Sequence, residues 1–322
     1  MDRSGRNGLD RDLFISLPER GYYLGSDFPS FRRYSGLFGL INFPDKDLPY
    51  FYPMEKKLIL QDIFIYPIKS LGGIRLAEGQ VEERGFRYDR RWMLVDETGR
   101  FVSQREFAKL ALLQVEVGED SLFVFHKADP NKRLQIPLDR AEGKELLVTI
   151  WDDEVTGKVV NEESGKWFSE FLGFKVDLVV MPESSKRAVD PRYAVNEESV
   201  SFADGMPYLF IGQSSLDDLN SRLENPVPMD RFRPNLVFSG GEPFLEDQLR
   251  KVQIGGVTFQ LIKPCARCVM TTVDQKTGEK GKEPLKTLSS YRTVNNKVMF
   301  GQNAVALNLG SVNIGDELIP LS

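Results

Sequence analysis

The stretch LILQDIFIYPI, residues 58–68, decides the fold class of this chain of 322 residues. It is a run of apolar, β-branched and aromatic side chains, and the turn pair Gly72-Gly73 follows it closely. Short runs of this kind between turn residues are typical of β-strands. We predict further strands in the same half of the chain at 91–96, 110–117, 121–126, 147–151 and 176–181. Their close spacing predicts a small barrel or sandwich.

A second unit of similar character begins with a strand at 208–212 and has few helices. We predict its other strands at 235–238, 252–263, 269–274, 304–309 and 312–321. A helix is predicted over 161–171, capped by Asn161 and with its aromatic residues on one face. A second helix is predicted over 214–223, capped by a serine, with Asp217 and Asp218 in its first turn. Residues 286–291 predict a short helical turn, so the fold class is mostly β (α+β).

Composition excludes several classes of protein. There are 42 Lys and Arg against 47 Asp and Glu, a net charge of −5, which argues against a protein that coats nucleic acid or anionic lipid. The longest apolar runs are far shorter than the roughly 20 residues that a membrane helix needs, so we expect no integral membrane segment and a cytoplasmic location. The length suggests two compact units or one large β unit.

The first 53 residues differ from the rest. They hold 11 of the 35 aromatic residues, with Gly and Pro scattered among them and no sustained period. Their composition fits neither a secretory signal nor a transit peptide. Two interpretations remain for residues 1–53: an extension that packs on the body, or a start codon placed upstream of a true start at Met54, which we favour slightly.

Soft metal ligands are scarce. The chain has two cysteines, Cys265 and Cys268, and one histidine, His126. This count excludes a disulfide framework, a four-cysteine or two-cysteine, two-histidine zinc site, and an iron–sulfur cluster with four thiolates from the chain. The C-x-x-C pair is open to three interpretations: a zinc half-site completed by carboxylates, a thioredoxin-like dithiol, or two inert buried thiols. The β-branched residues after Cys268 predict that the pair ends a loop and enters a strand.

Cations accompany the cysteines. Arg267 lies between them and would favour a thiolate over a thiol. Other cations occur where strands meet turns: Lys69, Arg90, Arg231 and Arg233. Each one alone is most simply a solvated charge. Taken together with a thiolate, which binds soft or intermediate metals, they predict a pocket for an anionic, phosphate-bearing cofactor.

Several motifs resemble one known family. YPIKSLGG (66–73) and DRRW (89–92) resemble the amino-terminal β-barrel module that precedes MOSC domains. FADGMPYLFIGQSSLDDLNSRL (202–223), MDRFRPNLVFSGG (229–241), KPCARCVMTTVDQKTGEKGKEPLKTLSSYR (263–292) and FGQNAVAL (300–307) resemble the MOSC domain itself. The resemblance implies an N-terminal β-barrel module over 54–172 and a MOSC β-barrel with a few short helices over 173–322. It is strongest toward the amidoxime-reducing, or N-hydroxylamine-reducing, molybdenum enzymes.

The resemblance also implies site residues. The second cysteine of C-x-R-C is the metal ligand in this family, which makes Cys268 the expected thiolate on molybdenum and the catalytic residue. Structural burial is then the expected role of Cys265. The pterin and phosphate of a molybdenum cofactor (Mo-molybdopterin) are expected at Lys69, Ser70, Arg90, Arg233, Asn235, Ala266 and Arg267.

The activity implied is reduction of small N-hydroxylated compounds to amines or amidines. Electrons would come from a separate flavin, ferredoxin or haem protein, because the chain has no further cysteines. The alternatives are a sulfur carrier that uses the same cysteine, as in molybdenum cofactor sulfurases, and a cofactor-binding carrier. Pyridoxal phosphate binding is a label of the family as a whole, and we assign no residue of this chain to it. No proton donor stands out, and Asp274 is best interpreted as an exposed turn carboxylate.

Overall fold

Short strands dominate the structure, as predicted. It is a computed structural model that describes residues 57–139 and 141–321, so both interpretations of residues 1–53 lie outside the described residues. The largest sheet has nine strands in the order β19-β14-β15-β17-β12-β13-β1-β2, with β16 paired to β17. Their bounds are β1 Ile59–Ile65, β2 Ile74–Leu76, β12 Tyr208–Gly212, β13 Leu236–Ser239, β14 Lys251–Ile254, β15 Val257–Arg267, β16 Thr293–Val294, β17 Lys297–Ala306 and β19 Leu318–Leu321.

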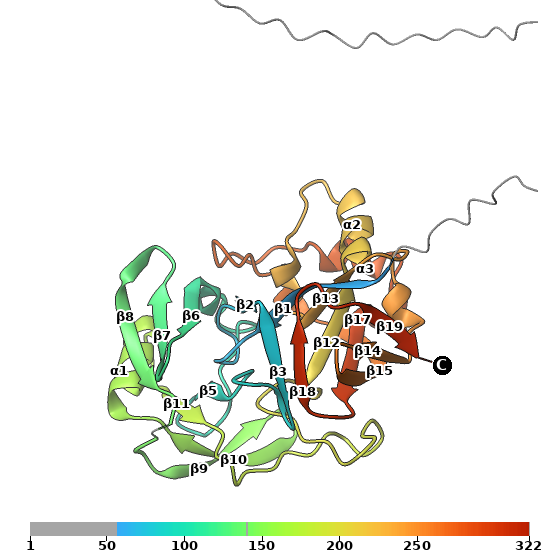
Figure 1. Cartoon of the computed structure of the whole chain (residues 1–322). Coiled ribbons are helices and arrows are strands. Elements are labelled where there is room, and N and C mark those ends of the chain that lie inside the picture. Colours follow the sequence, from blue (N-terminus) through green and yellow to red (C-terminus); the bar gives the residue numbers. More distant parts are fainter. Residues whose placement is uncertain (1–56, 140, 322) are drawn as a thin grey trace, which may run out of the picture. The chain divides into compact units, whose positions relative to one another are not determined.

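The large sheet joins the two ends of the described chain. β1 pairs antiparallel with β13, so that Ile59 lies opposite Ser239. In Figure 1 the blue β1 therefore lies among yellow to red strands. A three-stranded sheet also joins an early and a late part of the chain. In it, β18 (Gly310–Asn313) pairs with β3 (Glu78–Glu82), which pairs with β4 (Gly85–Phe86).

Two further sheets belong to the middle of the chain, drawn in green in Figure 1. The first has the order β5-β11-β10-β9, and the second is the meander β6-β7-β8. Their bounds are β5 Trp92–Val95, β6 Leu113–Val117, β7 Ser121–His126, β8 Asp129–Pro137, β9 Glu145–Ile150, β10 Asp153–Val159 and β11 Asp177–Val180.

Helices are few and short. The α-helices are α1 (Glu162–Leu172), α2 (Gln213–Ser221) and α3 (Leu285–Ser289), and the 3-10 turns are η1 (Ala108–Leu112), η2 (Met229–Arg231), η3 (Leu245–Asp247) and η4 (Val269–Thr272). Asn161 caps α1 as predicted, since its Oδ1 accepts a hydrogen bond from the Ser164 amide at 2.8 Å. In the part of the chain that the structure describes, no helix is long and apolar enough to cross a membrane.

Some predicted boundaries are wrong. The helix predicted over 214–223 begins earlier, at Gln213, with Gly212 as its N-cap and no serine cap. The hydroxyls of Ser214 and Ser215 donate instead to the Glu242 carbonyl and to the buried Glu246. The strand predicted over 252–263 is two strands, β14 and β15, because the turn at Gly255-Gly256 reverses the chain where Gly255 has a φ of 54°. Gly315, with a φ of 96°, similarly divides the strand predicted over 312–321 into β18 and β19.

Of the clusters of buried apolar residues in the described parts of the chain, the two largest support these sheets. One lies under the nine-stranded sheet and includes Phe210, Phe238 and Phe259, all fully buried. The other lies among β5, β6, β7 and α1 and includes Leu94 and Phe168. Burial of each large side chain contributes about 2 kcal/mol before entropy is counted, so both regions have an apolar core of their own. The predicted fold class, mostly β with a few short helices, is confirmed.

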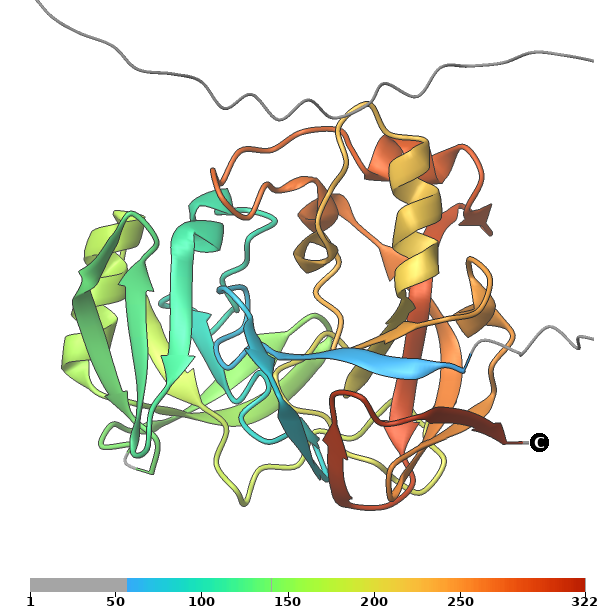
Figure 2. The same cartoon turned by 45° about the horizontal axis from the view of Figure 1, so that its top comes forward.

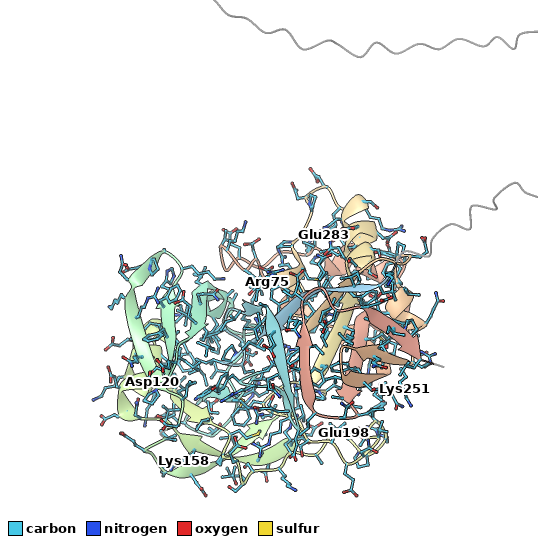
Figure 3. All side chains as sticks on the ribbon, in the orientation of Figure 1. Arg75, Asp120, Lys158, Glu198, Lys251 and Glu283 are labelled. Carbon is cyan, nitrogen blue, oxygen red and sulfur yellow. The ribbon has the colours of Figure 1, made fainter. Side chains whose placement is uncertain are left out.

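A loop after the C-x-x-C pair connects the two regions. Figure 2 shows this orange loop lying beside the green segment near η1. Lys127 Nζ donates to the Gln275 carbonyl at 2.6 Å, and the Gln104 and Gln275 side-chain amides bond each other at 3.1 and 3.3 Å. Further along the loop, Arg231 Nη2 donates to the carbonyl of Glu283, the residue labelled near the top of Figure 3. These bonds connect segments that lie beside the candidate cofactor site.

Candidate cofactor site

One cavity of about 750 Å³ collects every residue that the sequence predicts for the site. It is lined by the predicted residues Lys69, Ser70, Arg90, Arg233, Asn235, Ala266, Arg267 and Cys268, and also by Cys265. These residues come from the loops after β1, before β5 and before β13, and from the end of β15. Strand ends from distant parts of the sequence therefore meet at this cavity.

The backbone is strained at three of these positions. Ser70, Arg90 and Arg233 have φ values of 72°, 49° and 52°, in the left-handed region that non-glycine residues rarely adopt. Each such residue costs about 1 kcal/mol or more, and such strain tends to collect at functional sites. Backbone hydrogen bonds hold the strained loops in place, for example from the Arg90 amide to the Tyr66 carbonyl at 3.0 Å.

Tyr66 orders the two arginines. The guanidinium groups of Arg90 and Arg233 both lie over its ring, 4.4 and 4.1 Å from the ring centre. Cation–π contacts of this kind are strongest when water is excluded, and Tyr66 is buried. Behind the ring, the buried Asp89 accepts hydrogen bonds from the Tyr66 amide, from Arg90 and from Asn235. Two like charges are thereby held side by side at the cavity wall.

The side chain of Asn235 is engaged within the protein. Its Nδ2 donates to the Phe64 carbonyl and to Asp89, both at 3.1 Å, and its Oδ1 accepts from Arg90 at 3.0 Å. The resemblance assigns this residue to the pterin. The contacts in the structure are those of a residue that orients Arg90 and Asp89.

The cavity is strongly cationic. Its lining includes seven cations and one carboxylate, that of Asp204; the cations are Lys69, Arg90, Arg105, Arg231, Arg233, Arg267 and Lys297. Burial lowers the pKa of Lys69 to about 8, although the neighbouring Asp204 acts in the opposite direction. Burial likewise lowers the pKa of Arg233 to about 10. An anion in this cavity would oppose both effects, because it would stabilise the charged forms.

The C-x-x-C corner differs from the prediction. Cys265 lies within β15, and Cys268 follows the end of that strand and begins η4, so the pair leaves a strand and enters a turn. The strand predicted over 269–274 is therefore wrong. The hydroxyls of Thr271 and Thr272 donate to the carbonyls three residues earlier, at 3.0 and 2.8 Å, and these local bonds outweigh the strand preference of the β-branched residues.

The two thiols have different partners. Arg267 Nη1 donates to Cys265 Sγ at 3.0 Å, although its place in the sequence is between the two cysteines. Cys268 Sγ accepts instead from Arg105 Nε at 3.2 Å, and Arg105 comes from the segment between β5 and η1. Both cysteines are half-buried, and Cys265 packs on a cluster that contains Phe232 and Phe300.

Sequence reasoning did not identify Arg105 or Asp204. Asp204 accepts hydrogen bonds from Lys69 Nζ at 2.6 Å and from Arg105 Nη2 at 2.8 Å. The side chain is 53% exposed, although its carboxylate lies against the cavity wall. Partial desolvation there opposes its ionisation, but the two cations outweigh this and hold the pKa of the carboxyl well below its usual range. Asp204 belongs to the FADG segment (202–205), which is part of a family motif but was not assigned a role. Nothing near Arg105 in the sequence indicates its distant partners.

Unused hydrogen-bonding atoms suit a polar ligand. Ser70 Oγ, Arg105 Nη1 and Arg267 Nε are buried and have no hydrogen-bond partner within residues 57–139 and 141–321. Buried polar groups are normally paired, so these three atoms fit an oxygen- and nitrogen-rich anion such as a phosphorylated pterin. Over the same residues, there is no group of three or more His, Cys, Asp or Glu side chains that could hold a metal ion. Asp274 lies in the predicted turn and accepts from the amides of Lys276 and Thr277.

Comparison with known proteins agrees with these observations. The family model "MOSC N-terminal beta barrel domain" matches residues 57–175, and "MOSC domain" matches residues 197–319. The chain is 34% identical to mitochondrial amidoxime-reducing component 1 of Mus musculus, over 79% of each chain. It is 30% identical to the Homo sapiens protein of that name, over 82% of this chain and 85% of the relative.

A molybdenum cofactor sulfurase of Oryza sativa subsp. japonica is 31% identical over 80% of this chain and 33% of its own length. The relatives thus link the chain to proteins of molybdenum cofactor chemistry and to amidoxime reduction. The chain belongs to the family of MOSC-domain proteins with an N-terminal MOSC β-barrel, together with the amidoxime-reducing components.

Proposed function

We propose that this protein is a molybdenum-cofactor-dependent reductase of N-hydroxylated compounds, with Cys268 as the protein ligand of molybdenum. The observation that carries the proposal is the meeting of two arginine-bonded thiols, Cys265 and Cys268, and seven cations in a single cavity of about 750 Å³. The family resemblance selects Cys268 as the ligand. A cofactor that combines a soft metal with a phosphate needs both kinds of partner.

Each group of residues has a part in holding the cofactor. Lys69, Arg90 and Arg233 would neutralise its phosphate, and Ser70 Oγ would use its free hydrogen-bonding capacity there. Ala266 and Arg267, at the end of β15, would present their backbone groups to the pterin. Tyr66 and Asp89 would keep the two arginines in place without touching the cofactor.

When bound, the molybdenum centre would supply two-electron chemistry that turns an N-hydroxyl group, with two protons and two electrons, into an N–H group and water. The chain's own contribution is orientation and protons. Lys69 and Asp204 form an ion pair at the cavity, and a lysine with a pKa of about 8 can hold or release a proton near neutral pH. We propose a separate flavin, ferredoxin or haem protein as the electron donor. The cytoplasmic location stays a prediction, and the names of the amidoxime-reducing relatives place those proteins in mitochondria.

The first experiment measures molybdenum and pterin in the purified protein. We expect about one molybdenum per chain, nearly all of it lost on Cys268→Ala and most of it kept on Cys265→Ala. The second variant is a matched control, because both cysteines are half-buried and line the same cavity. Equal loss from the two variants would mean that Cys268 is not the specific ligand.

The second experiment tests turnover. Benzamidoxime or 6-hydroxylaminopurine is supplied with an artificial electron donor, and the amidine or amine is measured. The expected result is product from the wild type and from Cys265→Ala but not from Cys268→Ala. A molybdenum-loaded protein that reduces neither compound would contradict the proposed activity.

A second function is favoured by the similarity to the plant cofactor sulfurase, over 80% of this chain. In that case Cys268 would carry sulfur as a persulfide. Mass spectrometry distinguishes the two functions: a persulfide on Cys268 in a protein without reductase activity would favour sulfur transfer.

A further inference from the structure

Three cavities meet at one tryptophan. Trp151 lines the cofactor cavity, a second cavity of about 740 Å³ and a third of about 400 Å³. The second cavity also shares Asp204 and Gly205 with the first. Trp151 therefore lines both the cavity that contains the Cys268 thiol and an adjoining space large enough for the non-reacting part of a small molecule.

The position of Trp151 is not explained by the needs of the fold. Trp151 and Asp152 form the two-residue turn between β9 and β10, because Ile150 pairs directly with Asp153. Trp151 has a φ of 57° there, a conformation that such turns normally give to Gly, Asn or Asp. Its side chain is 47% exposed, so it fills no core. A large aromatic residue in a strained and exposed turn suggests a function.

Its neighbours hold the indole in place. The guanidinium of Arg105 lies 4.3 Å from the ring centre, and the Phe101 ring meets it edge-on at 5.2 Å. The indole Nε1 donates to Asp204 Oδ1 at 3.4 Å. Arg105 is also the residue that bonds Cys268 Sγ. The indole is thus fixed one residue away from the reacting centre, and a fixed platform binds a flat ligand with little loss of entropy.

We propose that Trp151 forms a binding subsite for the planar part of aromatic N-hydroxylated substrates, which lies in the second cavity while the N-hydroxyl group reaches toward Cys268. The inference rests on the proposed function and narrows its substrate class. Exposed indoles bind flat π-systems by stacking, and a contact of this kind changes affinity by about tenfold. An aliphatic substrate has no flat ring to stack and would gain little from it.

The test compares two substrates and two variants. Benzamidoxime carries a ring and acetamidoxime only a methyl group. Trp151→Asn removes the indole and suits the positive φ of the turn, and Trp151→Tyr keeps an aromatic ring. Leu147→Asn is the control, because Leu147 lies in β9, the strand that leads into this turn, is 61% exposed and lines none of the three cavities.

We expect Trp151→Asn to lower kcat/KM for benzamidoxime about tenfold through KM, and to affect acetamidoxime much less. Trp151→Tyr should recover most of the difference, and Leu147→Asn should show none of it. Equal losses for the two substrates would overturn the subsite. A wild-type protein that is loaded with molybdenum and reduces neither substrate would instead contradict the proposed function itself.

Binding without turnover gives a second measurement. Benzamidine, a flat amidine that needs no reduction, should quench part of the tryptophan fluorescence of the wild type. Of the three tryptophans Trp151 is exposed, Trp167 is partly buried and lines none of the three cavities, and Trp92 is buried. The quenching should vanish in Trp151→Asn. Quenching that persists in this variant would overturn the proposal, whether or not the protein carries its cofactor.

Discussion

Replacing the buried Lys69 by methionine should make the protein without its cofactor more stable. Lys69 is 5% exposed, and burial lowers its pKa from 10.5 to about 8. One pKa unit is worth about 1.4 kcal/mol, so keeping this lysine charged at neutral pH costs the fold about 3 kcal/mol. Methionine has a similar length and no charge. The substitution also removes the hydrogen bond to the Phe202 carbonyl, a loss of about 1 kcal/mol, which leaves a net gain of about 2 kcal/mol.

The gain should depend on pH in a defined direction. Below pH 8 the lysine is charged in both the folded and the unfolded protein, and the full penalty applies. Between about pH 8 and pH 10.5 the folded wild type releases its proton first, so its stability rises with pH and the advantage of Lys69→Met shrinks. The lost attraction between Lys69 and Asp204 is already included in the roughly 3 kcal/mol, because it is one of the causes that set the pKa of Lys69. Arg105 still bonds that carboxylate in the variant.

Urea unfolding of wild type and Lys69→Met at pH 7 and pH 10 measures this effect. Lys175→Met is the control, since the Lys175 side chain is 70% exposed and its removal should change the free energy of unfolding little at either pH. A destabilised Lys69→Met at pH 7, or a difference that is the same at both pH values, would refute the reasoning. The same variant should bind the cofactor less well, so molybdenum content should fall as stability rises.

Two further changes test the fold. Glu246 is fully buried, and burial raises its pKa from 4.5 to about 7, so the folded protein loses stability as pH rises from 4.5 to 7. Glu246→Gln should therefore be about 3 kcal/mol more stable than the wild type at pH 8 and nearly equal to it at pH 4.5, as measured by urea unfolding. Equal effects at both pH values would argue against ionisation as the cause. Asn161→Ala removes the cap of α1 and should lower the free energy of unfolding by about 1 kcal/mol, seen as a lower thermal midpoint; an unchanged midpoint would mean that the cap contributes nothing.

Local patterns predicted local structure well. The runs at 121–126 and 208–212 are strands with the predicted bounds, and Asn161 caps the helix that was expected after it. Where the prediction of an element failed, side-chain hydrogen bonds that the residue pattern does not reveal decided the local structure. At 269–274, threonine hydroxyls close a turn where β-branched residues predicted a strand.

The site was predicted only in part, because its assembly depends on contacts between distant residues. The resemblance indicated the cationic residues, and all of them line one cavity. The bond between Arg105 and Cys268 spans 163 positions of sequence, and no spacing rule reports such a pair. From its place between the two cysteines, Arg267 was expected to favour a thiolate at the pair, but its side chain bonds Cys265 and leaves Cys268 to Arg105.

The pairing of β1 with β13 has a consequence for biosynthesis. During translation the chain emerges from its N-terminus, so β1 can pair with β2 early but leaves the ribosome long before β13, its other neighbour, has been made. β1 cannot complete its pairing until residue 239 is available, and β3 must wait even longer for β18. One edge of β1 therefore stays unpaired for most of synthesis, and we expect the nascent chain to depend on chaperones over that interval.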